Sequence, residues 1–193
     1  MGKERLLAFT DGVLAIVITI MVLELKAPEE PSFEALGAML PIFLSYVLSF
    51  VYVGIYWNNH HHMFQLVERV SGGMLWANLA LLFFLSLIPF TTAWMDETHA
   101  ETAPVALYGI SLLGPGIAYY ILQLVTIRAQ DNDDLKIAVG SDLKGKLSPL
   151  IYLVGIALAF VSTWAAIAVY VVVALIWLVP DRRIERHLAA KRA

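Results

Sequence analysis

The chain has 193 residues, of which 60% are hydrophobic and 15% are charged, with a formal net charge of −3 and no cysteine. These values, with a mean hydropathy of +0.74, exclude an ordinary soluble domain and favour a protein that lies in a membrane. The absence of cysteine also excludes disulfides and thiolate metal sites. Since one span needs about 20 apolar residues, a chain of this length has room for about six spans with short loops.

Six apolar stretches follow one another and predict an all-α membrane protein with six transmembrane helices in a single domain. The predicted helices cover about residues 5–25, 33–67, 74–94, 104–127, 147–162 and 164–179. The second is longer than a bilayer is thick. A polar loop precedes the last two, which form a tight hairpin that turns near Ser162 and Thr163.

The distribution of basic residues indicates how this layout is oriented. An even number of spans places both termini on one side, and Lys26 is the single basic residue on the other. Twelve share the side of the termini: Lys3, Arg5, Arg69, Arg128, Lys136, Lys144, Lys146, Arg182, Arg183, Arg186, Lys191 and Arg192. The positive-inside rule then predicts cytoplasmic termini, in the inner (plasma) membrane of the cell. The opposite loops are acidic, which would concentrate cations there: Glu29, Glu30, Glu34, Asp96, Glu97 and Glu101.

Polar groups within the predicted spans are few, and a charge near the membrane centre costs ~3 kcal/mol or more unless it finds a partner. Those of the first three helices fall at the cytoplasmic side and can meet in one cluster: Asp11, Trp57, Asn58, Asn59, His60, His61, His62, Trp76 and Asn78.

Three roles are open for this cluster. The imidazoles, with Trp57 and Asn78, can hydrogen-bond the Asp11 carboxylate and hold the helices together. A proton relay through Asp11 and the histidines is a second role, since histidine titrates near neutrality. A metal site is disfavoured, because consecutive residues on a helix point about 100° apart and cannot converge on one ion by themselves.

One face of the first predicted helix carries a mostly apolar stripe. At about 100° per residue, its members are Phe9, Gly12, Ile16, Thr19, Ile20 and Leu23. Asp11 lies about 120° from the centre of the stripe and is expected to face protein. Periodicity alone makes the stripe a lipid face or a packing seam, and the Thr19 hydroxyl can bond back to the carbonyl four residues earlier. The sequence has no Thr-Val-Gly-Tyr-Gly filter and no arginine-rich voltage-sensing helix.

The start of this helix resembles a known family. Arg5-x-x-x-Phe9-Thr10-Asp11, followed by an apolar helix that ends Val22-Leu23-Glu24-Leu25, resembles the hallmark Arg-x-x-x-Phe-Ser-Asp of transmembrane protein 175, the endolysosomal potassium channel, in its short prokaryotic form. Thr10 keeps the hydroxyl of the usual serine. The second helix matches at Tyr56-Trp57-x-x-His60-His61-x-x-Phe64, and the third at Leu75-Trp76-x-Asn78-Leu79 through Ser86-Leu87-x-Pro89-Phe90.

The resemblance implies a homotetramer in which the first helix of each subunit lines a central pore, without a filter loop. By position, Ile16 resembles the innermost hydrophobic constriction and Leu23 an outer ring. Thr19 resembles the hydroxyl layer proposed to contact potassium, and Ile20 is its neighbour on the stripe.

The resemblance also implies that the motif residues Arg5, Phe9, Thr10 and Asp11 hold the cytoplasmic end of the first helix against the next two helices. This agrees with the polar cluster, whose family-matching members are Trp57, His60, His61, Trp76 and Asn78.

We therefore expect a potassium-permeable, modestly K⁺-selective leak-type channel, with no enzymatic activity, no cofactor and no metal. Its expected partners are further copies of the chain, the lipid bilayer, and K⁺ and other monovalent cations, with no nucleic acid. One alternative is a proton-coupled secondary transporter that uses Asp11 and His60–His62, although the sequence shows no internal repeat with interrupted helices. Another is an intramembrane metal-dependent enzyme, although no His-Glu-x-x-His helix is present.

Overall fold

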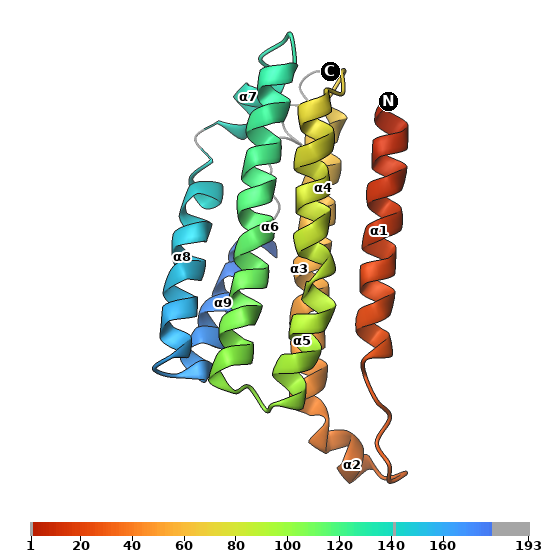
Figure 1. Cartoon of the computed structure of the whole chain (residues 1–193), viewed down its shortest axis with the longest axis vertical. Helices are drawn as coiled ribbons and strands as arrows, with labels where there is room; N and C mark the ends of the chain where they lie inside the picture. The colour runs from red at the N-terminus through yellow and green to blue at the C-terminus, as the bar shows by residue number, and fades with distance from the viewer. Residues whose placement is uncertain (1, 141, 179–193) are drawn as a thin grey trace.

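The computed structural model describes residues 2–140 and 142–178, and within these ranges all regular secondary structure is α-helical (Figure 1). The predicted end of the last helix at residue 179 and the basic residues from 182 onward lie outside the described part. The helices are α1 (Lys3–Leu23), α2 (Phe33–Ala38), α3 (Leu40–Gln65), α4 (Gly72–Ser86), α5 (Ile88–Glu97), α6 (Thr102–Ala129), α7 (Asp134–Val139), α8 (Leu143–Ala159) and α9 (Thr163–Leu178).

Proline divides two stretches that the sequence predicts as single helices. The stretch 33–67 consists of α2 and α3 with Met39 between them, and the stretch 74–94 is divided at Leu87 into α4 and α5. Pro41 and Pro89 lie in the first turns of α3 and α5. Proline has no N–H to donate and its ring crowds the carbonyl four residues earlier, so it starts a helix more readily than it continues one.

The polar loop before the last two helices is more ordered than the sequence predicts. It contains the short helix α7, and α8 begins at Leu143 rather than near residue 147. Asp142 is the N-cap of α8, and its Oδ1 accepts a hydrogen bond from the Gly145 N–H at 3.0 Å. A carboxylate at this position satisfies one of the free N–H groups of the first turn and favours the earlier start.

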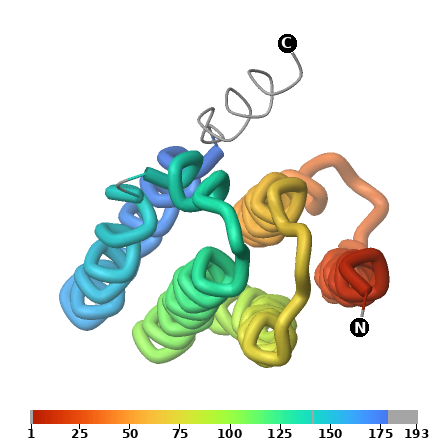
Figure 2. The backbone as a smooth tube through the Cα atoms, turned by 90° about the horizontal axis from the view of Figure 1, so that it is seen from above, coloured from red at the N-terminus to blue at the C-terminus, as the bar shows by residue number. Residues whose placement is uncertain are grey.

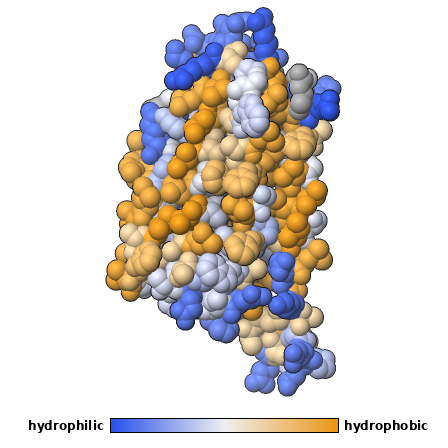
Figure 3. Space-filling model, in the orientation of Figure 1, coloured by the Kyte–Doolittle hydropathy of each residue, from blue (hydrophilic) through white to orange (hydrophobic). Residues whose placement is uncertain are grey.

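Four helical stretches among the described residues are long and apolar enough to cross a membrane. They are α1, α3, α4 with α5, and α6, while α9 is a shorter apolar helix. The face shown in Figure 3 has apolar side chains in a broad central band, with polar side chains gathered at the two ends. This distribution is what a bilayer requires of a bundle of spanning helices.

Helix α6 occupies the middle of the bundle and α1 its edge. In Figures 1 and 2, α6 lies between α4 and α8, and α1 stands beside α3 and α4 with its other side uncovered. Close packing of α4 on α6 depends on Gly114, because a Cβ there would lie 2.3 Å from Cδ1 of Phe84. Helix α1 contacts α3, α4 and α5.

Candidate functional site

Helix α1 has one packed face and one uncovered face. Residues at helical spacing are buried against the bundle: Leu6, Thr10, Leu14, Val17 and Met21. The stripe that the sequence defines lies on the uncovered face, where Ile16 is 59% exposed and Leu23 is 79% exposed. Phe9, Gly12, Thr19 and Ile20 are also exposed. A membrane helix with an apolar face that its own chain leaves uncovered needs lipid or another protein chain to cover it.

The Thr19 hydroxyl breaks the apolar character of this face. It donates a hydrogen bond to the carbonyl of Ile16 at 2.9 Å, three residues earlier. A hydroxyl has one proton to donate and two lone pairs. Because the proton is used within the helix, the oxygen presents its lone pairs as an acceptor on the uncovered side.

Three buried polar side chains join α1 to α3 and α4. Asn78 Nδ2 donates to Thr10 Oγ1 at 2.9 Å, and Asn78 Oδ1 lies 2.9 Å from Nε2 of His60. The His60 ring stacks on Phe64 at 4.3 Å between centroids. All three polar residues are at most 3% exposed. A satisfied chain of this kind fixes helix positions, because losing one member leaves the others unpaired in a low-dielectric interior.

A second contact holds the start of α1 from the exposed side. The indole Nε1 of Trp57 donates to Oδ1 of Asp11 at 3.0 Å. His61 stacks on Trp57, and its Nε2 accepts a hydrogen bond from Gln65 Nε2 at 2.9 Å. The Asp11 carboxylate therefore bonds to the Trp57 indole. Asn78 bonds to Thr10, and His60 bonds to Asn78, so neither of them forms the bond to Asp11 that the sequence predicts.

Two further residues that the sequence predicts to join the cluster lie at the surface. Arg5 is exposed and Trp76 is 73% exposed, and neither joins the hydrogen bonds above. Within residues 2–140 and 142–178, no three His, Asp or Glu side chains are arranged to hold a metal ion. The rings of His61 and His62 meet edge to face at 5.7 Å, while His60 turns toward Phe64.

The other end of α1 lies beside acidic groups. Lys26 forms an ion pair with Glu97 at 3.2 Å. Ser45 donates to Oδ1 of Asp96 at 2.5 Å, which joins α3 to α5. Glu24 lines the pocket between these elements together with Asp96 and Glu97. A cation that approaches this end of α1 meets a negative potential.

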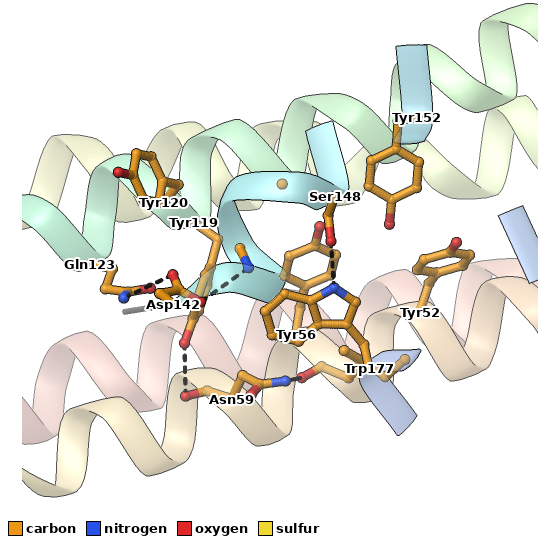
Figure 4. Close-up of a pocket in the computed structure, with 13 residues that line it drawn as sticks. Tyr52, Tyr56, Asn59, Tyr119, Tyr120, Gln123, Asp142, Ser148, Tyr152 and Trp177 are labelled. Carbon is orange, nitrogen blue, oxygen red and sulfur yellow. Dashed lines mark hydrogen bonds between the residues drawn. The ribbon is translucent and has the colours of Figure 1, made fainter. Parts of the chain in front are cut away.

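Some polar contacts between helices are not evident in the sequence. Ser49 on α3 is fully buried and bonds to both Thr92 on α5 and Tyr108 on α6, at 2.8 and 2.9 Å. A tyrosine-lined cavity lies between α3, α6, α8 and α9 (Figure 4). Single serines and tyrosines in apolar helices carry no spacing signal, so only the packed structure reveals which of them meet.

Comparison with known proteins places this geometry in a family. A sequence model described as endosomal/lysosomal potassium channel TMEM175 matches residues 5–89. A protein of Chryseobacterium sp. (strain P1-3) that is named as a potassium channel is 56% identical over 189 residues, which are 97% of this chain and 98% of the relative. The chain belongs to the TMEM175 family. The resemblance found in the Arg5–Asp11 motif is thereby confirmed.

Two further relatives resemble the chain over most of its length. A potassium channel of Streptomyces collinus is 32% identical over 183 residues, or 89% of each chain. A crystal structure described as a lysosomal potassium-selective channel TMEM175 homolog from Chamaesiphon minutus superposes with a TM-score of 0.79 at 29% identity, over 93% of this chain and 97% of that one.

The mammalian TMEM175 proteins are longer. The mouse protein, named an endosomal/lysosomal proton channel, is 34% identical over 117 residues, which are 52% of this chain and 23% of the mouse protein. The relatives are named as channels and not as enzymes, as the sequence leads one to expect. As a TMEM175 family member with several apolar helices, the chain is a multi-pass membrane protein.

Proposed function

We propose that this TMEM175 family member is one subunit of a homotetrameric, potassium-permeable and modestly K⁺-selective leak-type channel. The observation that carries the proposal is the two-faced burial of α1, whose stripe is uncovered while its opposite face is packed. If α1 from each of four subunits faces a common axis, the stripe lines a pore and needs no filter loop. The family relatives named as potassium channels support this assignment.

Three stripe residues have distinct roles in this pore. Four Ile16 side chains form a hydrophobic ring that can gate by dewetting, because a hydrated ion crosses a narrow apolar neck at high cost. The Thr19 oxygens replace part of the ion's hydration shell, with Ile20 beside them. Potassium gives up water more readily than sodium, so partial replacement favours it modestly. Leu23 forms an outer ring.

The proposed subunit crosses the membrane six times, through α1, α3, α4 with α5, α6, α8 and α9. Both termini then lie in the cytoplasm and the chain resides in the plasma membrane, consistent with its basic residues. The acidic groups Glu24, Asp96 and Glu97 lie at the outer entrance, where they attract cations.

Potassium flux into liposomes that contain the purified chain tests the proposal. We expect passive K⁺ flux that exceeds Na⁺ flux. Ile16→Asn should increase flux because it makes the constriction polar, and Thr19→Ala should lower the K⁺/Na⁺ ratio while Thr19→Ser retains it. Ile110→Asn, the same polar change at an exposed position on α6, is the matched control and should leave the flux of correctly inserted protein unchanged.

A proton-coupled transporter is the second candidate. Relatives that are named as proton channels are the specific reason to consider proton movement. In that case Asp11 and His60–His62 would carry the proton. The contact of Asp11 with Trp57 weighs against a relay, because an indole N–H donates a hydrogen bond and has no acceptor with which to pass a proton on. Potassium flux that requires an imposed proton gradient would contradict the channel proposal and support the transporter.

A further inference from the structure

The cavity between α3, α6, α8 and α9 is separate from α1 and has aromatic walls (Figure 4). The centre of a water molecule can occupy about 30 Å³ of this cavity. That is enough for about two or three waters or a ligand of similar size. Six aromatic residues line it: Tyr52, Tyr56, Tyr119, Tyr120, Tyr152 and Trp177.

Hydrogen bonds to neighbouring groups hold three of these rings in place. The Tyr52 hydroxyl donates to the Tyr170 carbonyl at 2.5 Å, and the Tyr119 hydroxyl donates to the Asn59 carbonyl at 3.1 Å. The indole of Trp177 donates to Ser148 Oγ at 2.8 Å. With these polar ends engaged, the rings contribute a fixed aromatic surface to the cavity. Such a surface attracts cations through the negative face of each ring.

One carboxylate supplies the charge of the cavity. Asp142 accepts hydrogen bonds from the Gly145 N–H at 3.0 Å and from Gln123 Nε2 at 3.2 Å, and both donors are neutral. The ion pairs of Lys26, Arg69 and Lys136 involve other carboxylates. These two donors leave acceptor sites of the carboxylate open, so a bound cation or water can donate a further hydrogen bond to it.

We propose that this cavity binds a small primary alkylammonium ion. The ammonium group donates to the Asp142 carboxylate, and the short alkyl group lies against the tyrosine rings. An alkali cation prefers a shell of oxygen ligands. The cavity also presents oxygen atoms from tyrosine, Asn59, Gln123 and Ser148, so selection of an alkylammonium ion depends on the aromatic wall, against which only the alkyl group gains contact. The proposed site is independent of the function assigned to α1, since it uses none of the stripe residues.

Thermal unfolding of the purified full chain in lipid nanodiscs, titrated with ethylammonium at constant ionic strength, tests the proposal. A ligand that binds the folded state raises the midpoint in a saturable way. Asp142→Asn keeps an N-cap acceptor but removes the charge, and should weaken the apparent affinity about tenfold or more. Asp131→Asn is the matched control, because it removes an exposed carboxylate that pairs with Arg69, and should leave the titration unchanged.

A second pair of variants fills the cavity without changing its charge. A Cβ at Gly116 would lie 3.6 Å from the Tyr56 hydroxyl and 3.7 Å from Cε2 of Tyr152, in ordinary contact. Gly116→Leu should therefore abolish the ethylammonium effect. Gly116→Ala, which adds one methyl group, should reduce the effect, and it provides the test if the leucine variant fails to fold.

Three results would overturn the proposal. The absence of a saturable shift in the unaltered chain would leave water as the occupant of the cavity. An equal shift in Asp142→Asn and the Gly116 variants would place ethylammonium elsewhere, the pore included. A shift of the same size with potassium or with ethanol, the uncharged analogue of equal length, would show that the site does not select an alkylammonium ion.

Discussion

At the scale of single residues, Thr10 is the point at which the motif on α1 attaches to the rest of the chain. Its hydroxyl is buried and accepts a hydrogen bond from the Asn78 amide, which is also hydrogen-bonded to His60. The family hallmark has serine at this place, and both residues supply the same acceptor. The hydroxyl, and not the methyl group of threonine, is what the contact requires.

We expect Thr10→Val to lower the thermal unfolding midpoint and Thr10→Ser to leave it nearly unchanged. Valine keeps the volume of threonine but leaves the Asn78 amide without its acceptor, which costs ~1–3 kcal/mol in a buried position. Unfolding of the two variants in the same detergent, followed by tryptophan fluorescence, measures the difference. Equal midpoints would mean that water or another group takes over the bond.

The sequence predicts the members of this cluster better than their pairing. Trp57, His60 and Asn78 are expected near the start of α1, and the structure brings them there. Thr10 and Asp11 are adjacent on a helix and point about 100° apart, so a small rotation of α1 decides which of them faces α4. Only tertiary packing fixes that rotation, and the sequence could not assign Asn78 to Thr10.

At the scale of helices, the contact of α4 with α6 depends on a missing side chain. Phe84 packs where a Cβ on Gly114 would stand. Gly114→Ala should therefore destabilise the fold by ~1–3 kcal/mol, because the ring or the helix must move. Gly54→Ala on α3 is the matched control: nothing lies within 4 Å of its added Cβ, and alanine favours a helix over glycine. Midpoints that fall equally in both variants would contradict this account.

Helix boundaries follow from the sequence only where a residue enforces them. Pro41 and Pro89 are visible in the sequence, yet each stands within a long apolar stretch that hydropathy reads as one span. The early start of α8 depends on the Asp142 side chain, whose contact with Gly145 forms only in a particular turn. The tyrosine-lined cavity is still harder to predict from the sequence, since its walls come from helices that are far apart in the chain.

At the scale of the whole molecule, the chain leaves one apolar side of α1 uncovered. Helix α1 lies at the edge of the bundle (Figure 2), and its stripe is largely exposed, with Ile16 and Ile20 bordering a groove beside α5. In the proposed tetramer, the stripes of the other three copies of the chain cover this stripe.

A cysteine cross-link tests that arrangement, because the natural chain contains no cysteine. Leu23→Cys should form covalent dimers with a short bismaleimide in the membrane, since four α1 helices around an axis bring these positions together. Leu153→Cys on α8 is equally available, at 51% exposure, but should give only background dimers. If both variants gave background alone while K⁺ flux persisted, the stripe would face lipid.

The polar anchor of α1 imposes a requirement during synthesis as well as in the finished protein. A ribosome delivers α1 to the membrane before α3 and α4, so Asp11 and Thr10 enter before Trp57 and Asn78 can bond to them. Among the four long candidate spans α1 is the most apolar, and this excess offsets the unpaired carboxylate until its partners arrive. The composition of α1 is therefore constrained by membrane insertion in addition to the conducting role proposed for it.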